Sequence, residues 1–236
     1  MRFTRSRSIL RSWAHVAAAS FLLTAFAAGF TSGTATLFQG TFDESTGSIA
    51  ADIGTIQISG SSGIQIATAP DGGKLVQMKG NSSEKVTMNC KFSNDVTVMS
   101  GTLTISYEAI LATRDCPFDL GIHLDAPCSD TIPATGSDSW NHLVVAGKTT
   151  GVTLPPGVPI QINIVCARAN PAFDWSYVAW AQVLSSNPNT QTATIPYSGT
   201  LQNTANSPIS SFRFEKKSGT TGTLGLDDIY AAGPPQ

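Results

Sequence analysis

Apolar and polar residues alternate along five stretches of the chain, and this alternation predicts β-strands. In one stretch Leu103, Ile105 and Tyr107 alternate with Thr104 and Ser106. A period of two with a single apolar face is typical of an antiparallel strand that is half buried. The five stretches are residues 85–92, 102–109, 118–125, 160–166 and 212–215. Among their apolar side chains, we expect these in the core: Leu103, Ile105, Tyr107, Phe118, Leu120, Ile122, Ile162, Ile164, Phe212 and Phe214.

Weaker strand patterns and turns fill most of the remaining chain. Strands are predicted at residues 36–42, 55–58, 64–67, 74–78, 141–145, 192–195 and 222–229. Residues 173–184 are apolar on both faces, as a central strand would be. Clusters of Gly, Pro, Asn, Asp and Ser separate the segments, and no amphipathic helix is predicted after residue 27. Strands with one apolar face must close a core against one another. We therefore predict an all-β fold, a two-sheet antiparallel sandwich in a single domain of residues 28–236.

The first 27 residues have the pattern of a cleaved signal peptide. Arginines occupy positions 2, 5, 7 and 11 without any acidic residue, and an apolar stretch follows at residues 16–26. Residues 25–27 then form the small-x-small sequence of a signal-peptidase site. The alternative is a membrane anchor, but residues 13–30 are at the short limit for a span and include polar residues. We expect a secreted, periplasmic or cell-surface protein with no membrane span in the mature chain.

Composition and charge narrow the class of partner. Charged residues are 13% of the chain and hydrophobic residues 41%, which excludes a disordered chain and a membrane bundle. Removal of the first 27 residues takes away four arginines and no acid, so the formal net charge changes from −2 to −6. A mildly acidic mature protein argues against nucleic acid and against an anionic membrane as partners.

Four cysteines, Cys90, Cys116, Cys128 and Cys166, predict disulfide bonds in an exported protein. Their spacing does not match a zinc site. Three connectivities are open for two disulfides. The pair that is closest in sequence is disfavoured, because residues 118–124 are predicted as a strand of about 23 Å and a disulfide needs Cα atoms within about 7 Å. The parity of their strands points Cys90 and Cys166 inward.

Several segments resemble the laminin-G-like, concanavalin A-like group of jelly-roll sandwiches, and carbohydrate-binding modules of similar shape. The segments resemble, in order, the first strand, an early core strand, the central hairpin, the penultimate strand and the closing strand: residues 38–44, 101–107, 159–167 with 173–180, 209–215 and 224–229. The most distinctive feature is the Asp-Asp-Ile sequence that ends at Ile229. The resemblance implies a fold far more than a function.

The resemblance also implies a structural calcium ion, which in several such modules joins the first and last strands. The matching positions are Asp43, Glu44, Asp227 and Asp228. Calcium binds several carboxylate and carbonyl oxygens, and adjacent acids repel one another without a cation. Alternatively, these acids face solvent or accept hydrogen bonds from backbone N–H groups. We also expect a β-bulge at Asp227–Asp228, because the two acids interrupt the alternation of the last strand.

The sequence contains no recognisable catalytic motif. There is no G-x-S-x-G sequence, and cysteines that pair leave no activated thiolate. Hydrolases on the resembled fold usually carry Glu-x-Asp-x-x-Glu on one strand, and its polysaccharide lyases carry a Gln-x-His strand. Neither sequence is present. The sequence therefore does not favour an enzyme.

Aromatic residues are the remaining candidates for a binding site. Trp140, Trp180 and Tyr197 are the residues that we expect to stack on the apolar face of a sugar ring, and the alternative is that they fill the core. Trp175 and Trp180 have opposite parity, so at most one of them faces the core of a regular strand. The leading interpretation is an exported, non-catalytic binding module for glycan. The alternatives are a polysaccharide hydrolase or lyase on a concanavalin A-like fold, and a structural cell-surface protein.

Overall fold

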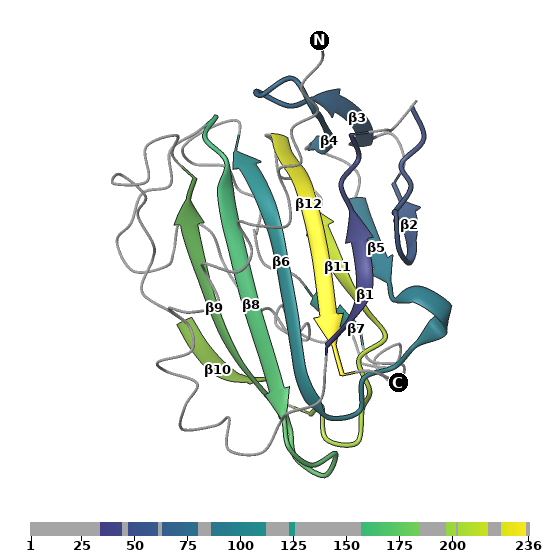
Figure 1. Ribbon diagram of the computed structural model, residues 1–236, viewed down its shortest axis with the longest axis vertical. Helices are drawn as coiled ribbons and strands as arrows, with labels where there is room; N and C mark the ends of the chain where they lie inside the picture. The colour runs from purple at the N-terminus through teal and green to yellow at the C-terminus, as the bar shows by residue number, and fades with distance from the viewer. Residues whose placement is uncertain are drawn as a thin grey trace. The chain divides into compact units, whose positions relative to one another are not determined.

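The computed structural model describes residues 34–43, 47–60, 63–79, 86–111, 123–125, 157–184, 197–201, 203–216 and 223–234, which form a two-sheet antiparallel β-sandwich (Figure 1). These residues belong to one compact unit, Thr34–Gln236. The predicted signal peptide lies outside the described residues. Among the residues that are described, no helix has the length and apolar character that a membrane span needs.

One sheet has eight strands and the other has four. The eight-stranded sheet has the order β10-β9-β8-β6-β12-β4-β3, with β1 paired to β12, and the four-stranded sheet has the order β2-β5-β11-β7. The strands are β1 (Ala35–Gly40), β2 (Thr55–Ser59), β3 (Ile64–Thr68), β4 (Lys74–Lys79), β5 (Val86–Lys91), β6 (Gly101–Leu111), β7 (His123–Asp125), β8 (Ile160–Arg168), β9 (Trp175–Val183), β10 (Tyr197–Leu201), β11 (Ser211–Lys216) and β12 (Thr223–Gly233). The all-β sandwich that the alternation predicts is confirmed.

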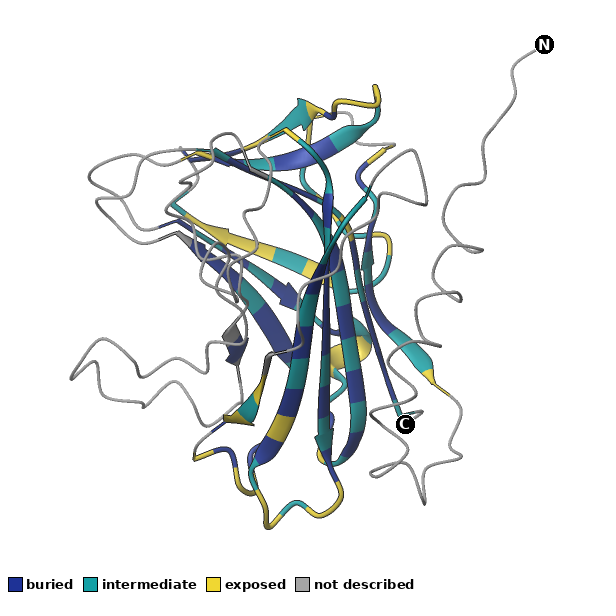
Figure 2. Cartoon of the chain, turned by 90° about the vertical axis from the view of Figure 1, so that its left-hand side faces the viewer, coloured by how far each residue is buried: buried dark blue, intermediate teal, exposed yellow. Residues whose placement is uncertain are grey.

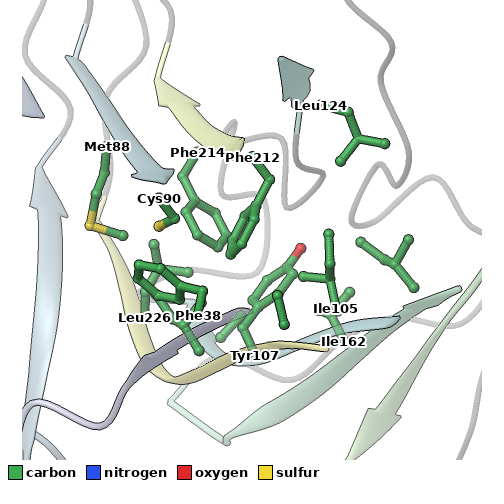
Figure 3. Packing of buried hydrophobic residues seen from close by; sticks show 14 of the residues in the cluster. Phe38, Met88, Cys90, Ile105, Tyr107, Leu124, Ile162, Phe212, Phe214 and Leu226 are labelled. Carbon is green, nitrogen blue, oxygen red and sulfur yellow. The ribbon is translucent and has the colours of Figure 1, made fainter. Parts of the chain in front are cut away.

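The core lies between the inward faces of the two sheets. Buried and less buried residues alternate along the long strands (Figure 2). Phe38 meets Phe212 edge-on with ring centroids 5.5 Å apart, and Tyr107 meets Phe214 in the same way at 4.9 Å (Figure 3). The predicted core residues that the structure describes are all buried: Leu103, Ile105, Tyr107, Ile162, Ile164, Phe212 and Phe214. Phe118, Leu120 and Ile122 lie outside the described residues.

The strand that is predicted at residues 173–184 is present as β9 and has neighbours on both sides, but it is not buried on both faces. Strand β9 lies between β8 and β10, the strand that ends the sheet order, and its burial alternates from Trp175 to Gln182. Trp175 is fully buried whereas Trp180 is only half buried. The outward face of β9 therefore carries apolar residues without being buried by a further layer of the described residues.

The predicted bulge in the last strand is confirmed. Asp227 pairs with Glu108 and Tyr230 pairs with Ser106, so β12 uses one residue more than β6 over this interval. Asp228 has a φ angle of 45°. The extra residue resets the parity of the strand, and Ile229 is fully buried as a result.

Cys90 and Cys166 point into the core, as their parity predicts, but both are free thiols. The expectation that these two residues take part in disulfides is therefore corrected. Cys90 is on β5 of the four-stranded sheet, opposite Phe212, and Cys166 is on β8 of the eight-stranded sheet, opposite Leu103. Each thiol is surrounded by apolar core residues, where cysteine behaves as a small hydrophobic side chain. Cys116 and Cys128 lie outside the described residues.

Candidate functional site

The outward face of the eight-stranded sheet, turned away from the four-stranded sheet, carries the one predicted sugar-stacking residue whose side chain the structure describes. Trp180 occupies an outward position on β9 and is half buried. Trp140 lies outside the described residues. Tyr197 is described only by its backbone, which begins β10 and pairs with Ala179. The structure thus confirms the opposite parity of Trp175 and Trp180, and it leaves the roles of Trp140 and Tyr197 as predictions.

Four strands place Trp180 at the end of a row of polar side chains. Asn163 on β8 pairs with Trp180, Ser106 on β6 pairs with Asn163, and Tyr230 on β12 pairs with Ser106. Residues that are directly opposite on antiparallel strands have Cβ atoms about 4.5–5.5 Å apart, so neighbours in this row are within contact. We call Trp180, Asn163, Ser106 and Tyr230 the Trp180 row. Strands β9, β8, β6 and β12 lie in this order across the sheet (Figure 1).

Asn163 is the most unusual member of the Trp180 row. The residue is 9% exposed, and its side-chain Nδ2 is buried without a hydrogen-bond partner. A buried donor that is left unpaired costs about 1–3 kcal/mol of stability. By contrast, the hydroxyl of Tyr230 lies 3.2 Å from Oγ1 of Thr36 on β1. A ligand hydroxyl could accept a hydrogen bond from this donor only if the side chains that cover Nδ2 moved aside.

A second polar row lies beside the first one. Gln182 on β9 pairs with Gln161 on β8, Gln161 pairs with Glu108 on β6, and Glu108 pairs with Asp227 on β12. We call these four residues the Glu108 row. Adjacent residues on one face of a strand are two positions apart, or about 7 Å. The two rows together offer amides, two hydroxyls, carboxyl groups and two aromatic rings within one part of the sheet.

Asp227 is held in an environment that disfavours its negative charge. Burial and the carboxyl groups of Asp228, Asp43 and Glu108 raise its pKa to about 8, although a backbone hydrogen bond opposes the shift. This bond is donated by the N–H of Asp228 to Oδ1 of Asp227 over 2.8 Å. At neutral pH the carboxyl group of Asp227 therefore retains its proton in most molecules, and it can both donate and accept hydrogen bonds.

The predicted calcium ligands are only partly brought together. Asp43 is close enough to Asp227 for its negative charge to raise the pKa of Asp227. However, Oδ1 of Asp43 accepts a hydrogen bond from the N–H of Lys74 over 3.2 Å. Asp228 is exposed, so the half-buried acid of the bulge is Asp227. Glu44 lies outside the described residues. Within the described part of the chain, no group of three or more His, Cys, Asp or Glu side chains could hold a metal ion. The calcium site stays a prediction.

Sequence reasoning missed Asn163, Ser106, Gln161, Gln182 and Glu108 as site residues. The alternation placed Asn163, Ser106, Gln161 and Glu108 on the polar faces of their strands, whereas Gln182 belongs to a segment that was predicted to be apolar on both faces. Which outward residues become neighbours depends on the order and register of the strands. A signal was present in the amide residues at alternate positions of two neighbouring strands, but it has a meaning only once β8 and β9 are known to pair.

No protein-family model matches the chain, and no curated protein matches its sequence. Several solved structures are similar in fold. A carbohydrate esterase from the Shiga toxin-encoding bacteriophage phi24B matches with a TM-score of 0.46 and 15% identity, over 86% of this chain and 100% of that chain. Peanut lectin matches with a TM-score of 0.48 and 10% identity, over 85% and 97%. The CBM22-1 xylan-binding domain from Paenibacillus barcinonensis matches with a TM-score of 0.42 and 12% identity, over 88% and 99%.

These similarities concern the fold alone. The two sheets and their strand order establish the antiparallel sandwich independently of these matches. Identities of 15% or less and TM-scores below 0.5 carry no argument about what the protein binds or whether it is an enzyme.

Proposed function

We propose that the protein is an exported, non-catalytic module that binds glycan on the outward face of the eight-stranded sheet. One observation carries this proposal. Trp180 lies half buried on that face, directly across from Asn163, whose Nδ2 has no hydrogen-bond partner. An exported protein meets glycans outside the cell. An acidic protein also repels nucleic acid, so glycan is the better candidate for the partner.

The chemistry of the Trp180 row suits a sugar. The face of an aromatic ring provides apolar contact to the C–H groups of a pyranose, and a few polar groups nearby fix its orientation through hydroxyls. A sugar hydroxyl that accepts a hydrogen bond from Nδ2 of Asn163 would remove the cost of the unpaired donor. Because Nδ2 is buried, the ligand reaches it only when flanking side chains part.

An array of soluble polysaccharides, followed by titration calorimetry, tests this proposal. Trp180→Ala should weaken binding about fivefold or more, since stacking of a nucleic-acid base on an aromatic ring is worth about 1–3 kcal/mol and a sugar would make a comparable contact. The matched control is Phe173→Ala, because Phe173 is 67% exposed but lies in the turn between β8 and β9 and not on the sheet. Binding that is lost in Phe173→Ala and kept in Trp180→Ala would move the site to the turn. An absence of binding to every glycan would reject the proposal.

A second candidate function, hydrolysis of a glycosidic bond, is favoured by Glu108 and Asp227. The two acids are directly opposite on β6 and β12, and the pKa of Asp227 is raised to about 8. Glycosidases use one carboxyl group with a raised pKa as the acid and a second carboxylate about 5–10 Å away. Release of new reducing ends from a bound polysaccharide, and its loss in Asp227→Asn, would support this function. Binding without any release supports the non-catalytic module.

The export of the protein rests on residues that the structure does not describe. The basic segment and the small-x-small sequence at residues 25–27 predict a mature N-terminus at or near Ala28. N-terminal sequencing of the exported protein tests this part separately. A chain that keeps Trp13 and stays in the membrane would contradict it.

A further inference from the structure

We infer that β2 is an interface between two copies of the protein, which pair antiparallel along this strand about a two-fold axis at Gln57. The inference concerns assembly and goes beyond the proposed function. Strand β2 ends the order of the four-stranded sheet and lies at one side of the sandwich (Figure 1). Within the described part of the chain it pairs with β5 alone. In that part of the chain, the backbone N–H and C=O groups on the other side of β2 face no strand.

The side chains of β2 are exposed, and its apolar face continues to the edge of the sheet. Four of its five residues are exposed. Ile58 is 37% exposed, although it lies opposite the fully buried Met88 and so is on the core side of the sheet. Ile56 lies opposite the buried Cys90 and packs against the core. A further strand beside β2 would cover the exposed part of this apolar face.

Strand β2 lacks the features that normally prevent an edge strand from pairing. Natural sheets protect an exposed edge with a charged residue, a proline or a β-bulge. Strand β2 has the sequence Thr-Ile-Gln-Ile-Ser, without charge or proline, and its register with β5 is regular over all five residues. A charged partner would gain no ion pair on this strand. An identical strand would meet no like charge, although the chain as a whole is acidic.

The sequence of β2 is self-complementary about its centre. Antiparallel pairing centred on Gln57 places each residue opposite one of the same chemical kind in the second copy: Gln57 opposite Gln57, Ile56 opposite Ile58, and Thr55 opposite Ser59. Amide then meets amide, isoleucine meets isoleucine and hydroxyl meets hydroxyl. A shift by one residue would place isoleucine opposite glutamine. The match favours a second copy of this chain over an unrelated strand.

The protein already contains a glutamine pair of this kind. Gln65 on β3 lies opposite Gln77 on β4, and Nε2 of Gln65 donates to Oε1 of Gln77 over 3.1 Å. The same bond between two Gln57 side chains would add to the isoleucine contacts and to the new backbone hydrogen bonds. An interface of one short strand from each copy is small, so we expect a dimer that dissociates on dilution.

Pairing about this axis would present both glycan-binding faces on the same side. Adjacent strands of one sheet share their two faces, so the outward faces of the two eight-stranded sheets would point in the same direction. Two copies of the Trp180 row would then bind one polymer more tightly than either copy binds it alone. This consequence rests on the proposed function, whereas the pairing of β2 does not.

Sedimentation velocity of the purified protein, at micromolar to millimolar concentration, tests the pairing. We expect monomers at the lowest concentration and dimers at the highest. Gln57→Lys and Gln57→Glu each place two like charges opposite one another, and each should raise the dissociation constant of the dimer about tenfold or more. An equimolar mixture of these two variants should restore the dimer, because lysine then faces glutamate. Since Gln57 is exposed, both variants should fold.

A matched control and the contrary outcomes complete the test. Gln65→Lys makes the same substitution at an exposed position on β3, the strand that ends the other sheet, and it should leave the dissociation constant unchanged. A protein that stays monomeric at millimolar concentration would overturn the inference. A dimer that both Gln57 variants leave intact, or that their mixture does not restore, would overturn it as well. Binding of glycan by the monomer would leave the proposed function standing in either case.

Discussion

The guanidinium carbon of Arg168 lies 4.6 Å from the centre of the Trp175 ring, so a buried cation stacks on a buried aromatic side chain. The N–H groups of Arg168 donate to the backbone carbonyls of Met99, Thr204 and Ser207. The side chain therefore joins the end of β8 to the segment before β6 and to the connection between β10 and β11. Desolvation lowers the pKa of Arg168, and the charge of Asp174 partly opposes this shift.

Replacement of Arg168 by lysine should destabilise the protein strongly. An ammonium group lacks the planar fork that reaches several carbonyls at once, and each buried carbonyl left unpaired costs about 1–3 kcal/mol. We expect Arg168→Lys to lower the free energy of unfolding by about 2–4 kcal/mol in denaturant titrations. Lys91→Ala is the control. It removes an ion pair with the exposed Asp95 and should cost about 1 kcal/mol or less. An equal loss in the free energy of unfolding for the two variants would show that the contacts of Arg168 do not stabilise the protein.

The bulge in β12 should tolerate glycine and reject valine. Asp228 has a φ angle of 45°, in the left-handed region that L-residues with branched side chains avoid. Asp228→Val should therefore cost about 1–2 kcal/mol, while Asp228→Gly should be neutral or slightly stabilising. Thermal melts of the two variants measure the difference. If valine were accepted as well as glycine, the bulge would not have this conformation in solution.

Asp227 should make the protein less stable as the pH rises. In the folded state the pKa is raised from 3.8 to about 8, so between these values the folded protein holds a proton that the unfolded chain releases. Stability contributed by this group is therefore lost progressively from about pH 4 to pH 8, and the full penalty remains above pH 8. Asp227→Asn keeps an oxygen that can accept the Asp228 N–H but has no charge. Its melting temperature should exceed that of the unchanged protein by a margin that grows over this interval, as differential scanning fluorimetry can measure.

A control and a contrary outcome complete the test of Asp227. Asp95→Asn changes an exposed carboxylate and should show no such growing margin. A constant difference between Asp227→Asn and the unchanged protein from pH 4 to pH 8 would mean that Asp227 titrates normally in the folded state.

Chelation of calcium should leave the melting temperature of the protein unchanged. Asp43 and Asp227 each accept a hydrogen bond from a backbone N–H, so these carboxyl groups already have partners within the protein. Thermal melts with calcium and with EDTA measure the effect. A drop in the melting temperature with EDTA that disappears in Asp43→Asn would instead establish the calcium site that the resemblance implies.

Cys90 and Cys166 should be unreactive in the folded protein and reactive after unfolding. Burial raises the pKa of Cys166 to about 12 and that of Cys90 well above its usual value, so neither forms the reactive thiolate at neutral pH. A thiol reagent should label both residues only in denaturant, which peptide mapping by mass spectrometry can assign. Failure of both to react in denaturant, with recovery after reduction, would restore the disulfides that the sequence predicts.

The sequence predicted most reliably which face of its strand each side chain occupies. Strict alternation placed Ile105, Ile162 and Phe212 inside, and parity alone separated Trp175 from Trp180. The adjacent acids of the last strand predicted the bulge at Asp227. These features follow from the geometry of a single strand, in which successive side chains point to opposite faces whatever the rest of the chain does.

Only the tertiary structure decided which residues share the site. Trp180, Asn163, Ser106 and Tyr230 come from four strands, and nothing local in the sequence aligns them. Their register depends on hydrogen bonds between strands and on the fit of both sheets around one core, which couples residues far apart in the chain. The same holds for Arg168, which points inward but finds its carbonyl partners in two distant loops. A sequence fixes directions along a strand, whereas neighbours across a sheet emerge when the whole core closes.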